Sequence, residues 1–219
     1  MKLLRDNGLT IVLMLAFLGS VVGMAIAGLS LENETLRQHG LPGMEMMEYL
    51  GSGAFLSGVF ENWESEFLQM SAYVVLTAYL FQRGSAESKD ADGSEEVDED
   101  PASRSRDAKA PLPVRAGGVW RVLYSYSLGI ALAGLFVASF VLHWVNSASA
   151  ANAAAAMHGE APASLLEHLG SATLWFESFQ NWQSEFLSTA VIVVLSIWLR
   201  YRGSPESKPV AKPHAETGA

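Results

Sequence analysis

The chain has 219 residues, a mass of 23.6 kDa and a formal net charge of −9. It contains no cysteine, which excludes disulfides, thiol catalysis and thiolate metal sites within this chain. The negative charge argues against nucleic acid as a partner. Half of the residues are hydrophobic, and they gather in four blocks separated by polar segments, unlike the even spread expected of a soluble core.

The first block covers residues 9–29 and carries no charge. A helix rises about 1.5 Å per residue, so about 20 residues cross the ~30 Å hydrocarbon layer of a bilayer. The block therefore predicts a transmembrane helix. A cleaved signal peptide is the alternative, because Lys2 and Arg5 precede the block and Ala25 and Ala27 have the spacing of a cleavage site. A signal core is usually shorter, about 7–15 residues.

The other three blocks predict further transmembrane helices over residues 63–81, 122–145 and 182–199. Small residues occur at helical spacing in the first and third of the four helices, namely Gly19, Gly23, Gly134 and Ala138. Small residues let membrane helices approach closely. We expect them to pack the helices of one chain together, with homodimerisation as the alternative.

An internal repeat links the two halves of the chain. Residues 60–68 read F-E-N-W-E-S-E-F-L and residues 179–187 read F-Q-N-W-Q-S-E-F-L, an offset of 119 positions without a gap. Both copies close on G-S-x-E-S-K, at residues 84–89 and 203–208. One supersecondary unit should therefore explain both halves.

The basic residues predict the orientation of the two repeats, residues 1–83 and 119–202. Thirteen of the fourteen Lys and Arg are Lys2 and Arg5 or lie within residues 83–121 and 200–212, and only Arg37 lies elsewhere. The positive-inside rule then places both termini and the linker in the cytoplasm. The predicted fold is an all-α, polytopic membrane protein with four transmembrane helices in two parallel helix-hairpin repeats.

Each repeat also carries a short amphipathic segment on the predicted outer face, residues 44–60 and 164–180. Each is too short and too polar to span, so we predict interfacial helices, with a re-entrant half-helix as the alternative. Ser164 and Glu167 have the spacing of a capping box.

Asn62 and Asn181 suit the N-caps of the helices that follow these segments. Such helix starts would place Trp63 and Trp182 at the headgroup level. At the other ends of the same helices, the expected cytoplasmic anchors are Arg83 and Arg202.

The linker, residues 84–118, is rich in carboxylates and has almost no large apolar residue. It cannot bury enough surface to offset its ordering entropy, so we predict a disordered cytoplasmic linker. The polar, proline-containing tail, residues 203–219, is expected to be disordered as well.

The candidate site is a polar stripe on the second helix of each repeat. Glu66 and Glu185 each follow their asparagine by four residues, on one helix face, and the stripe continues through Gln69, Tyr73 and Thr77 in the first copy. A carboxylate in a bilayer is costly unless it is paired, protonated or hydrated. A proton or cation site formed by Asn62, Glu66, Asn181 and Glu185 is one interpretation. The alternative places each Glu in the first turn of its helix, where it favours the helix N-terminus.

The histidines do not form a recognisable metal motif. His143, His158 and His168 are irregularly spaced, and we expect none of them to have a histidine counterpart in the first repeat. No nucleophile with a base and no cofactor motif is recognisable either. We therefore expect neither a metal, nor a cofactor, nor an enzymatic activity.

With its twin N-W-x-S-E-F-L motifs, at Asn62–Leu68 and Asn181–Leu187, the chain resembles an uncharacterised bacterial integral-membrane family, a domain of unknown function. The resemblance implies a bacterial inner-membrane protein and no particular activity. The expected role is a non-enzymatic structural or partner-binding component of the bilayer. A small channel or a proton- or cation-coupled transporter built around Glu66 and Glu185 is the alternative.

Overall fold

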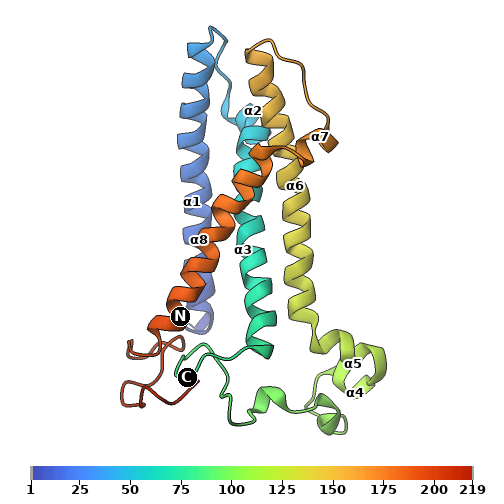
Figure 1. The fold of residues 1–219 in the computed structure, drawn as a ribbon, viewed down its shortest axis with the longest axis vertical. Coiled ribbons are helices and arrows are strands. Elements are labelled where there is room, and N and C mark those ends of the chain that lie inside the picture. The colour runs from blue at the N-terminus through green and yellow to red at the C-terminus, as the bar shows by residue number, and fades with distance from the viewer. Residues whose placement is uncertain (1, 219) are drawn as a thin grey trace. The chain divides into compact units, whose positions relative to one another are not determined.

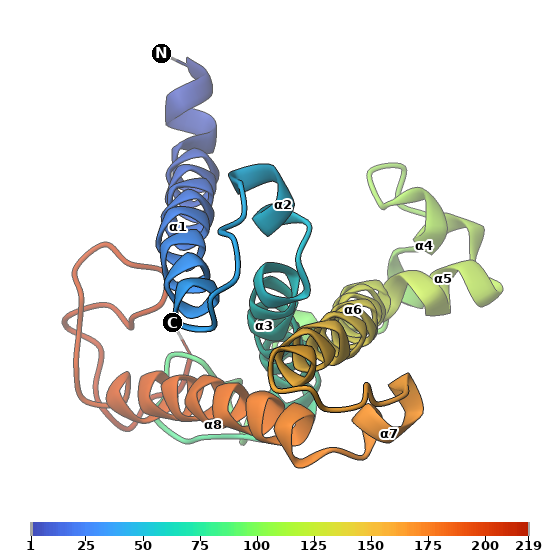
Figure 2. The ribbon, with the colours of Figure 1, turned by 90° about the horizontal axis from the view of Figure 1, so that it is seen from above.

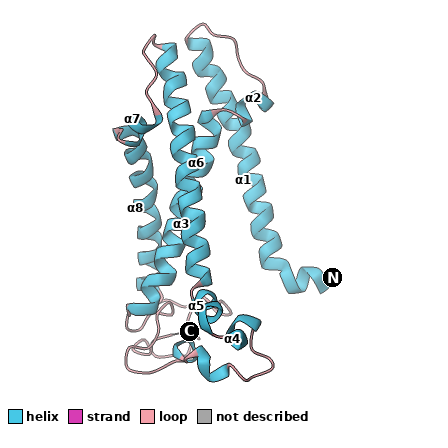
Figure 3. Cartoon of the chain, turned by 90° about the vertical axis from the view of Figure 1, so that its right-hand side faces the viewer, coloured by secondary structure: helices cyan, strands magenta, loops and turns pink. Residues whose placement is uncertain are grey.

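The structure is a computed structural model that describes residues 2–218. Helices and loops make up this part of the chain, which contains no strand (Figure 3). The long helices are α1 (Lys2–Gln38), α3 (Gly53–Tyr79), α6 (Ser127–Met157) and α8 (Ala172–Leu195) (Figure 1). The short ones are α2 (Met46–Leu50), α4 (Leu112–Ala116), α5 (Gly118–Ser125), α7 (Leu165–Leu169) and the 3₁₀ helices η1 (Glu96–Asp98) and η2 (Pro101–Arg104). The predicted all-α class is confirmed.

Two helices are long and apolar enough to cross a membrane by length and composition, Leu4–Gln38 within α1 and Ser127–Met157. The sequence predicts four spans, but α3 and α8 do not pass this test within residues 2–218. Their acidic and amide side chains are the reason, since a charge at the bilayer centre costs at least about 2.5–3.5 kcal/mol. A signal sequence near an N-terminus passes the same test as α1, so the signal-peptide alternative stays open.

The chain divides into two compact units, each built from two segments. One unit comprises Met1–Phe60 and Val141–Leu174, and the other comprises Glu61–Phe140 and Trp175–Ala219. Helix α3 therefore begins in the first unit and continues into the second.

The core of the first unit lies where α2 docks on α1 (Figure 2). Ala25, Tyr49 and Phe55 are buried there, and the two aromatic rings lie 5.5 Å apart between centroids. A Cβ atom on Gly28 would lie only 2.0 Å from the Tyr49 hydroxyl oxygen. Gly28 thus lets the tyrosine reach the backbone of α1. The equivalent positions 119 residues later hold Ser147 and His168, both buried, with Ser147 Oγ 2.9 Å from His168 Nε2.

The connections after α1 and α6 are closed by the same pair of hydrogen bonds. The Asn33 side chain donates to the Met44 carbonyl at 3.1 Å and accepts from the Met44 N–H at 2.7 Å. Asn152 donates to the Ala163 carbonyl at 3.0 Å and accepts from its N–H at 2.8 Å. The two pairs are 119 positions apart, the offset of the sequence repeat. A single asparagine therefore fixes each connection against its helix.

The predicted boundaries of the interfacial helices, 44–60 and 164–180, are wrong. Each segment forms only a one-turn helix, α2 or α7, followed by a turn at Gly51 or Gly170 and then by the start of the long helix. Ser52 caps α3 by accepting the Phe55 N–H, and Ser171 caps α8 by accepting the Leu174 N–H, both at 3.2 Å. The predicted capping box of α7 is confirmed, with Ser164 and Glu167 bonded reciprocally.

The early helix starts correct a second prediction. Asn62 and Asn181 lie inside α3 and α8 rather than at their N-caps. The long helices begin ten residues before Trp63 and Trp182, so no helix start places these two side chains at the headgroup level.

In the second unit, aromatic side chains pack α8 against the first half of α6. The ring centroids of Phe136 and Trp182 are 6.2 Å apart, and those of Phe140 and Trp175 are 6.0 Å apart. Phe179 lies 5.3 Å from Trp182. Trp182 is therefore part of an aromatic cluster.

The two G-S-x-E-S-K segments fold into the same turn. Gly84 and Gly203 both have positive φ, +80° and +88°, a conformation that favours glycine. The second serine of each motif accepts a backbone N–H from before the turn: Ser88 from Gln82 and Ser207 from Tyr201, both at 2.9 Å. Each long helix thus ends in a hydrogen-bonded turn.

The linker that the sequence predicts to be disordered, residues 84–118, carries the two 3₁₀ helices and the short helix α4. Ion pairs join Arg83 to Asp92 and Arg104 to Glu99, and all four side chains are exposed. Exposed pairs of this kind contribute little to stability. The linker buries one apolar side chain, Val114, within the described residues.

Candidate functional site

Side-chain hydrogen bonds connect α3 to α8 within the second unit. Asn181 donates to the Glu61 carboxylate, and the indole N–H of Trp182 donates to Glu64 Oε1 at 2.8 Å. Further along, Gln69 donates to the Thr189 hydroxyl at 2.5 Å. The bonded positions are 118 or 120 residues apart, whereas the repeat has an offset of 119. Each residue is therefore bonded to a residue one position away from its own counterpart in the other copy. We call this set of bonds the α3–α8 polar row.

Sequence reasoning did not identify Glu61 and Glu64 as candidate site residues. In the structure Glu64 is fully buried. The repeat itself carried a signal for them. Within the nine-residue motif only two positions differ between the copies, and both replace Glu in the first copy by Gln, at Gln180 and Gln183. An amide can keep a hydrogen bond while it removes a charge. A position that holds Glu in the first copy and Gln in the second therefore indicates that it lies close to the contact between the two copies.

The predicted site residues are only partly brought together. Glu66 is exposed and Glu185 is half-buried, and they lie near enough for the charge of Glu66 to act on Glu185. Asn181 bonds to Glu61, and Asn62 lies exposed on α3. The charge of Glu66 thus reaches Glu185, whereas Asn181 is bonded to Glu61 outside this pair.

The helix-start interpretation of Glu66 and Glu185 is wrong. Each is the fourteenth residue of its helix, so both lie beyond the first turn. At about 1.5 Å per residue this is roughly 20 Å from the helix start. The favourable effect of a helix N-terminus on an anion fades within its first turn and does not reach them.

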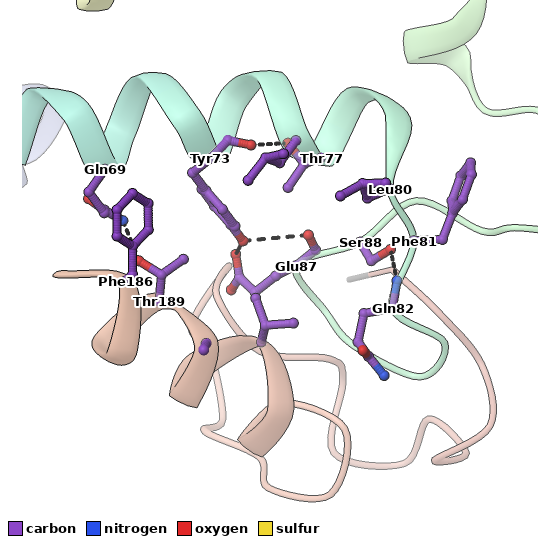
Figure 4. Close-up of a pocket in the computed structure, with 13 residues that line it drawn as sticks. Gln69, Tyr73, Thr77, Leu80, Phe81, Gln82, Glu87, Ser88, Phe186 and Thr189 are labelled. Atoms are coloured by element: carbon purple, nitrogen blue, oxygen red, sulfur yellow. Dashed lines mark hydrogen bonds between the residues drawn. The ribbon is translucent and has the colours of Figure 1, made fainter. Parts of the chain in front are cut away.

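A second acidic pair lies beyond the end of α3 and comes from the two G-S-x-E-S-K turns. The Tyr73 hydroxyl donates to Glu87 Oε2 at 2.8 Å, as Figure 4 shows. Burial raises the pKa of the Glu87 carboxyl, and repulsion from Glu206 raises this pKa further, whereas the Tyr73 hydrogen bond lowers it. Glu87 and Glu206 are equivalent positions of the repeat. Sequence reasoning placed Tyr73 in the polar stripe but missed both glutamates.

A cavity of about 310 Å³ opens beside this pair. Apolar side chains from both helices form most of its wall, among them Leu76, Leu80 and Phe186. Tyr73 and Glu87 lie on its polar side (Figure 4). Its volume is at the lower end of the range for small-ligand sites, about 300–1,000 Å³.

The other predicted residues lie outside the polar row. Arg83 is bound to Asp92, and Arg202 is exposed in the tail. No described atom lies within 4 Å of where a Cβ would stand on Gly19, Gly23 or Gly134, and Ala138 is exposed. The close approaches occur instead at Gly28, at Gly53 against Ala150 and at Gly58 against Met24, because there a neighbouring backbone or a long side chain reaches the helix.

One prediction about the histidines is wrong. His158 has a histidine counterpart in the first repeat, His39, and the two rings pack edge to face with centroids 5.3 Å apart. Each Nδ1 lies 2.9 Å from the carbonyl four residues earlier. His168 contacts Ser147, and His143 is buried. Within residues 2–218 there is no cluster of three or more His, Asp or Glu side chains that could hold a metal.

Comparison with other proteins adds a family and no activity. No curated protein and no solved structure matches the chain. Its whole length, residues 1–219, matches a family described as a domain of unknown function (DUF6766), and the chain belongs to that family.

Proposed function

We propose that the protein is a multi-pass integral membrane protein that binds and passes protons or small cations at Glu66 and Glu185, which lie along α3 and α8 between the bonded positions of the α3–α8 polar row. It performs no enzymatic reaction in this proposal. The observation that carries it is the position of these two glutamates, each fourteen residues into a long helix and near the other.

Depth explains why this position matters. A helix of 27 residues, the length of α3, extends for about 40 Å, enough to cross a ~30 Å hydrocarbon layer. Glu66 would then lie near the middle of the layer. A carboxylate is expensive there, and intramembrane acids that persist usually face a partner or a water-filled path. Glu64 with Trp182 and Gln69 with Thr189 supply such a polar surrounding.

The matched contacts support two repeats of the same orientation. The Asn33 and Asn152 bridges, the Ser52 and Ser171 caps and the two G-S-x-E-S-K turns recur at an offset of 119 residues. Combined with the distribution of Lys and Arg, they favour four crossings with both termini and the linker in the cytoplasm of a bacterium. In this proposal α3 and α8 cross the bilayer, as do the more apolar α1 and α6.

A flux assay tests the function. The full chain is reconstituted into liposomes that contain a pH-sensitive dye, and a pH step is applied with a permeant counterion. We expect proton or cation flux above that of empty liposomes, and we expect Glu66→Gln with Glu185→Gln to abolish it. A matched control is Glu48→Gln with Glu167→Gln, an equivalent pair in α2 and α7 that lies outside the polar row.

Two results would refute the proposal. One is the absence of flux with the native chain under proton, sodium and potassium gradients. The other is an equal flux from the Glu66 and Glu185 double variant and from its control. Either result would leave a structural or partner-binding role in the membrane as the better interpretation.

A further inference from the structure

The cavity beside Glu87 has a feature that the proposed function does not use. Glu87 Oε2 accepts the Tyr73 hydroxyl, but Glu87 Oε1 is buried and has no hydrogen-bond partner within residues 2–218. A buried polar atom without a partner is unfavourable, because no hydrogen bond replaces the hydration that it has lost. An incoming ligand that satisfies this oxygen would remove the penalty.

Charge indicates which kind of ligand fits. Glu87 and Glu206 repel each other, and neither takes part in an ion pair within the described part of the chain. The nearby basic side chains have other partners: Lys89 pairs with Asp98 and lies 5.6 Å from the centroid of the Phe81 ring, Lys208 donates to the carbonyls of His214 and Glu216, and Arg200 donates to the carbonyls of Ser196 and Lys212. The cavity therefore has the Glu87 carboxylate on its polar side, and no basic side chain within residues 2–218 forms an ion pair with it.

The wall of the cavity restricts the ligand further. Apart from its polar side it is lined by aliphatic and aromatic groups from α3, α8 and the segment that follows α3, including Leu80, Phe81 and Phe186 (Figure 4). A hydrated metal ion would leave this apolar surface unused. An ammonium group on an apolar body would match both the acidic and the apolar part of the wall.

We propose that this cavity binds an organic cation, an amine or quaternary ammonium with a small apolar body, whose charge pairs with the Glu87 carboxylate. The site is separate from Glu66 and Glu185 and does not require transport. Tyr73 is a positioning residue, because its hydroxyl donates to Oε2 and fixes the Glu87 carboxylate beside the cavity that both residues line.

Binding should depend on pH. Burial raises the pKa of the Glu87 carboxyl above its ordinary value of 4.5, the hydrogen bond from Tyr73 of α3 lowers it, and Glu206 of the second G-S-x-E-S-K turn raises it. The net shift is upward, so the carboxyl is protonated at a higher pH than an ordinary glutamate. The ion pair requires the ionised carboxylate, and acid should therefore weaken binding.

Calorimetric titration of the full chain in a nonionic detergent tests the proposal without any membrane gradient. The probe is benzyltrimethylammonium, whose charge does not depend on pH, and the comparison compound is neopentylbenzene, its neutral isostere. We expect saturable binding of the cation at pH 8 and weaker binding at pH 5. The neutral isostere should bind at least about tenfold more weakly, the factor that corresponds to one modest ion pair.

Variants identify the group involved. Glu87→Gln should lower the affinity for the cation about tenfold or more, whereas Glu99→Gln, which removes an equal charge from an exposed linker position, should leave it unchanged. Tyr73→Phe should retain the cation preference, since the charge of Glu87 remains. Circular dichroism and gel filtration establish that each variant is folded.

Three outcomes would overturn the proposal: equal binding of the cation and its isostere, unchanged affinity in folded Glu87→Gln, or no saturable heat up to about 10 mM, which is weaker than a specific site. Because the measurement uses detergent-solubilised protein, loss of ion flux in liposomes would leave this result unaffected. The two proposals therefore fail independently.

Discussion

Replacing Gly28 tests how α2 is docked on α1. In Gly28→Ala the added Cβ would lie 2.0 Å from the Tyr49 hydroxyl oxygen and 2.9 Å from Cζ of the same ring, closer than real Cβ contacts. Tyr49 is 5% exposed and belongs to the core of the first unit, so the ring has little room to move. We expect the overpacked variant to lose about 1–3 kcal/mol of unfolding free energy.

The second copy supplies a compensating change for this substitution. The equivalents of Gly28 and Tyr49 are Ser147 and His168, whose side chains fit together at 2.9 Å. Gly28→Ser alone should destabilise the chain about as much as Gly28→Ala, and Tyr49→His alone should lose the packing of the larger ring. The combined variant should recover most of the Gly28→Ser loss, with a coupling energy of about 1–3 kcal/mol.

Unfolding in mixed micelles, followed by circular dichroism as the fraction of denaturing detergent rises, gives the four free energies of this double-mutant cycle. Strict additivity of the two substitutions would refute the inferred contact. So would a Gly28→Ala variant as stable as the native chain, since a 2.0 Å approach cannot be relieved without movement of the ring or the helix.

Three further predictions concern the caps, the acidic pair and the tail. Ser171→Ala and Ser52→Ala should each cost about 1 kcal/mol in the same unfolding assay, because each removes the acceptor of a helix N-cap, and no loss in either would contradict the assignment. The raised pKa of Glu87 means that its contribution to stability is fully present below pH 4.5 and is lost as the pH rises through the higher folded value. Thermal midpoints should therefore fall with pH in that window in the native chain relative to Glu87→Gln, and parallel pH profiles would contradict this sign. Lys208 is buried and donates to the carbonyls of His214 and Glu216, so Lys208→Met should make the tail more sensitive to limited proteolysis. Lys89→Met, at the equivalent half-buried position of the linker, should not, and equal sensitivity of the tail in both variants would argue against the role of these carbonyl contacts.

The class of fold was predictable from the sequence because apolar blocks of helical length are a strong signal. The helix boundaries were not, and Ser52 and Ser171 show why. Each follows a glycine inside a segment whose apolar residues continue on both sides, so periodicity alone does not mark the turn. Asn181, which the sequence suggested as an N-cap, instead lies inside α8 and donates a hydrogen bond to Glu61.

The candidate site was predictable only where one helix face contained it. Glu66 and Glu185 stand on a stripe with a period of about 3.6 residues, which the sequence displays directly. Glu64 faces another helix, and only its contact with Trp182 reveals its role. Glu87 lies beyond the end of α3, where a hydrogen-bonded turn directs it back toward Tyr73, and no periodicity extends through a turn.

The exchange of Glu61 and Glu64 for Gln180 and Gln183 has a consequence for how such a protein is built. Two identical subunits related by a dyad would have to carry the same acid on both sides of their shared surface, and the acids would face one another there. Fusing both halves into a single polypeptide removes that constraint, since each half can then change on its own. The tandem arrangement thereby permits a directional, asymmetric interior that a symmetric pair of half-length chains could not encode.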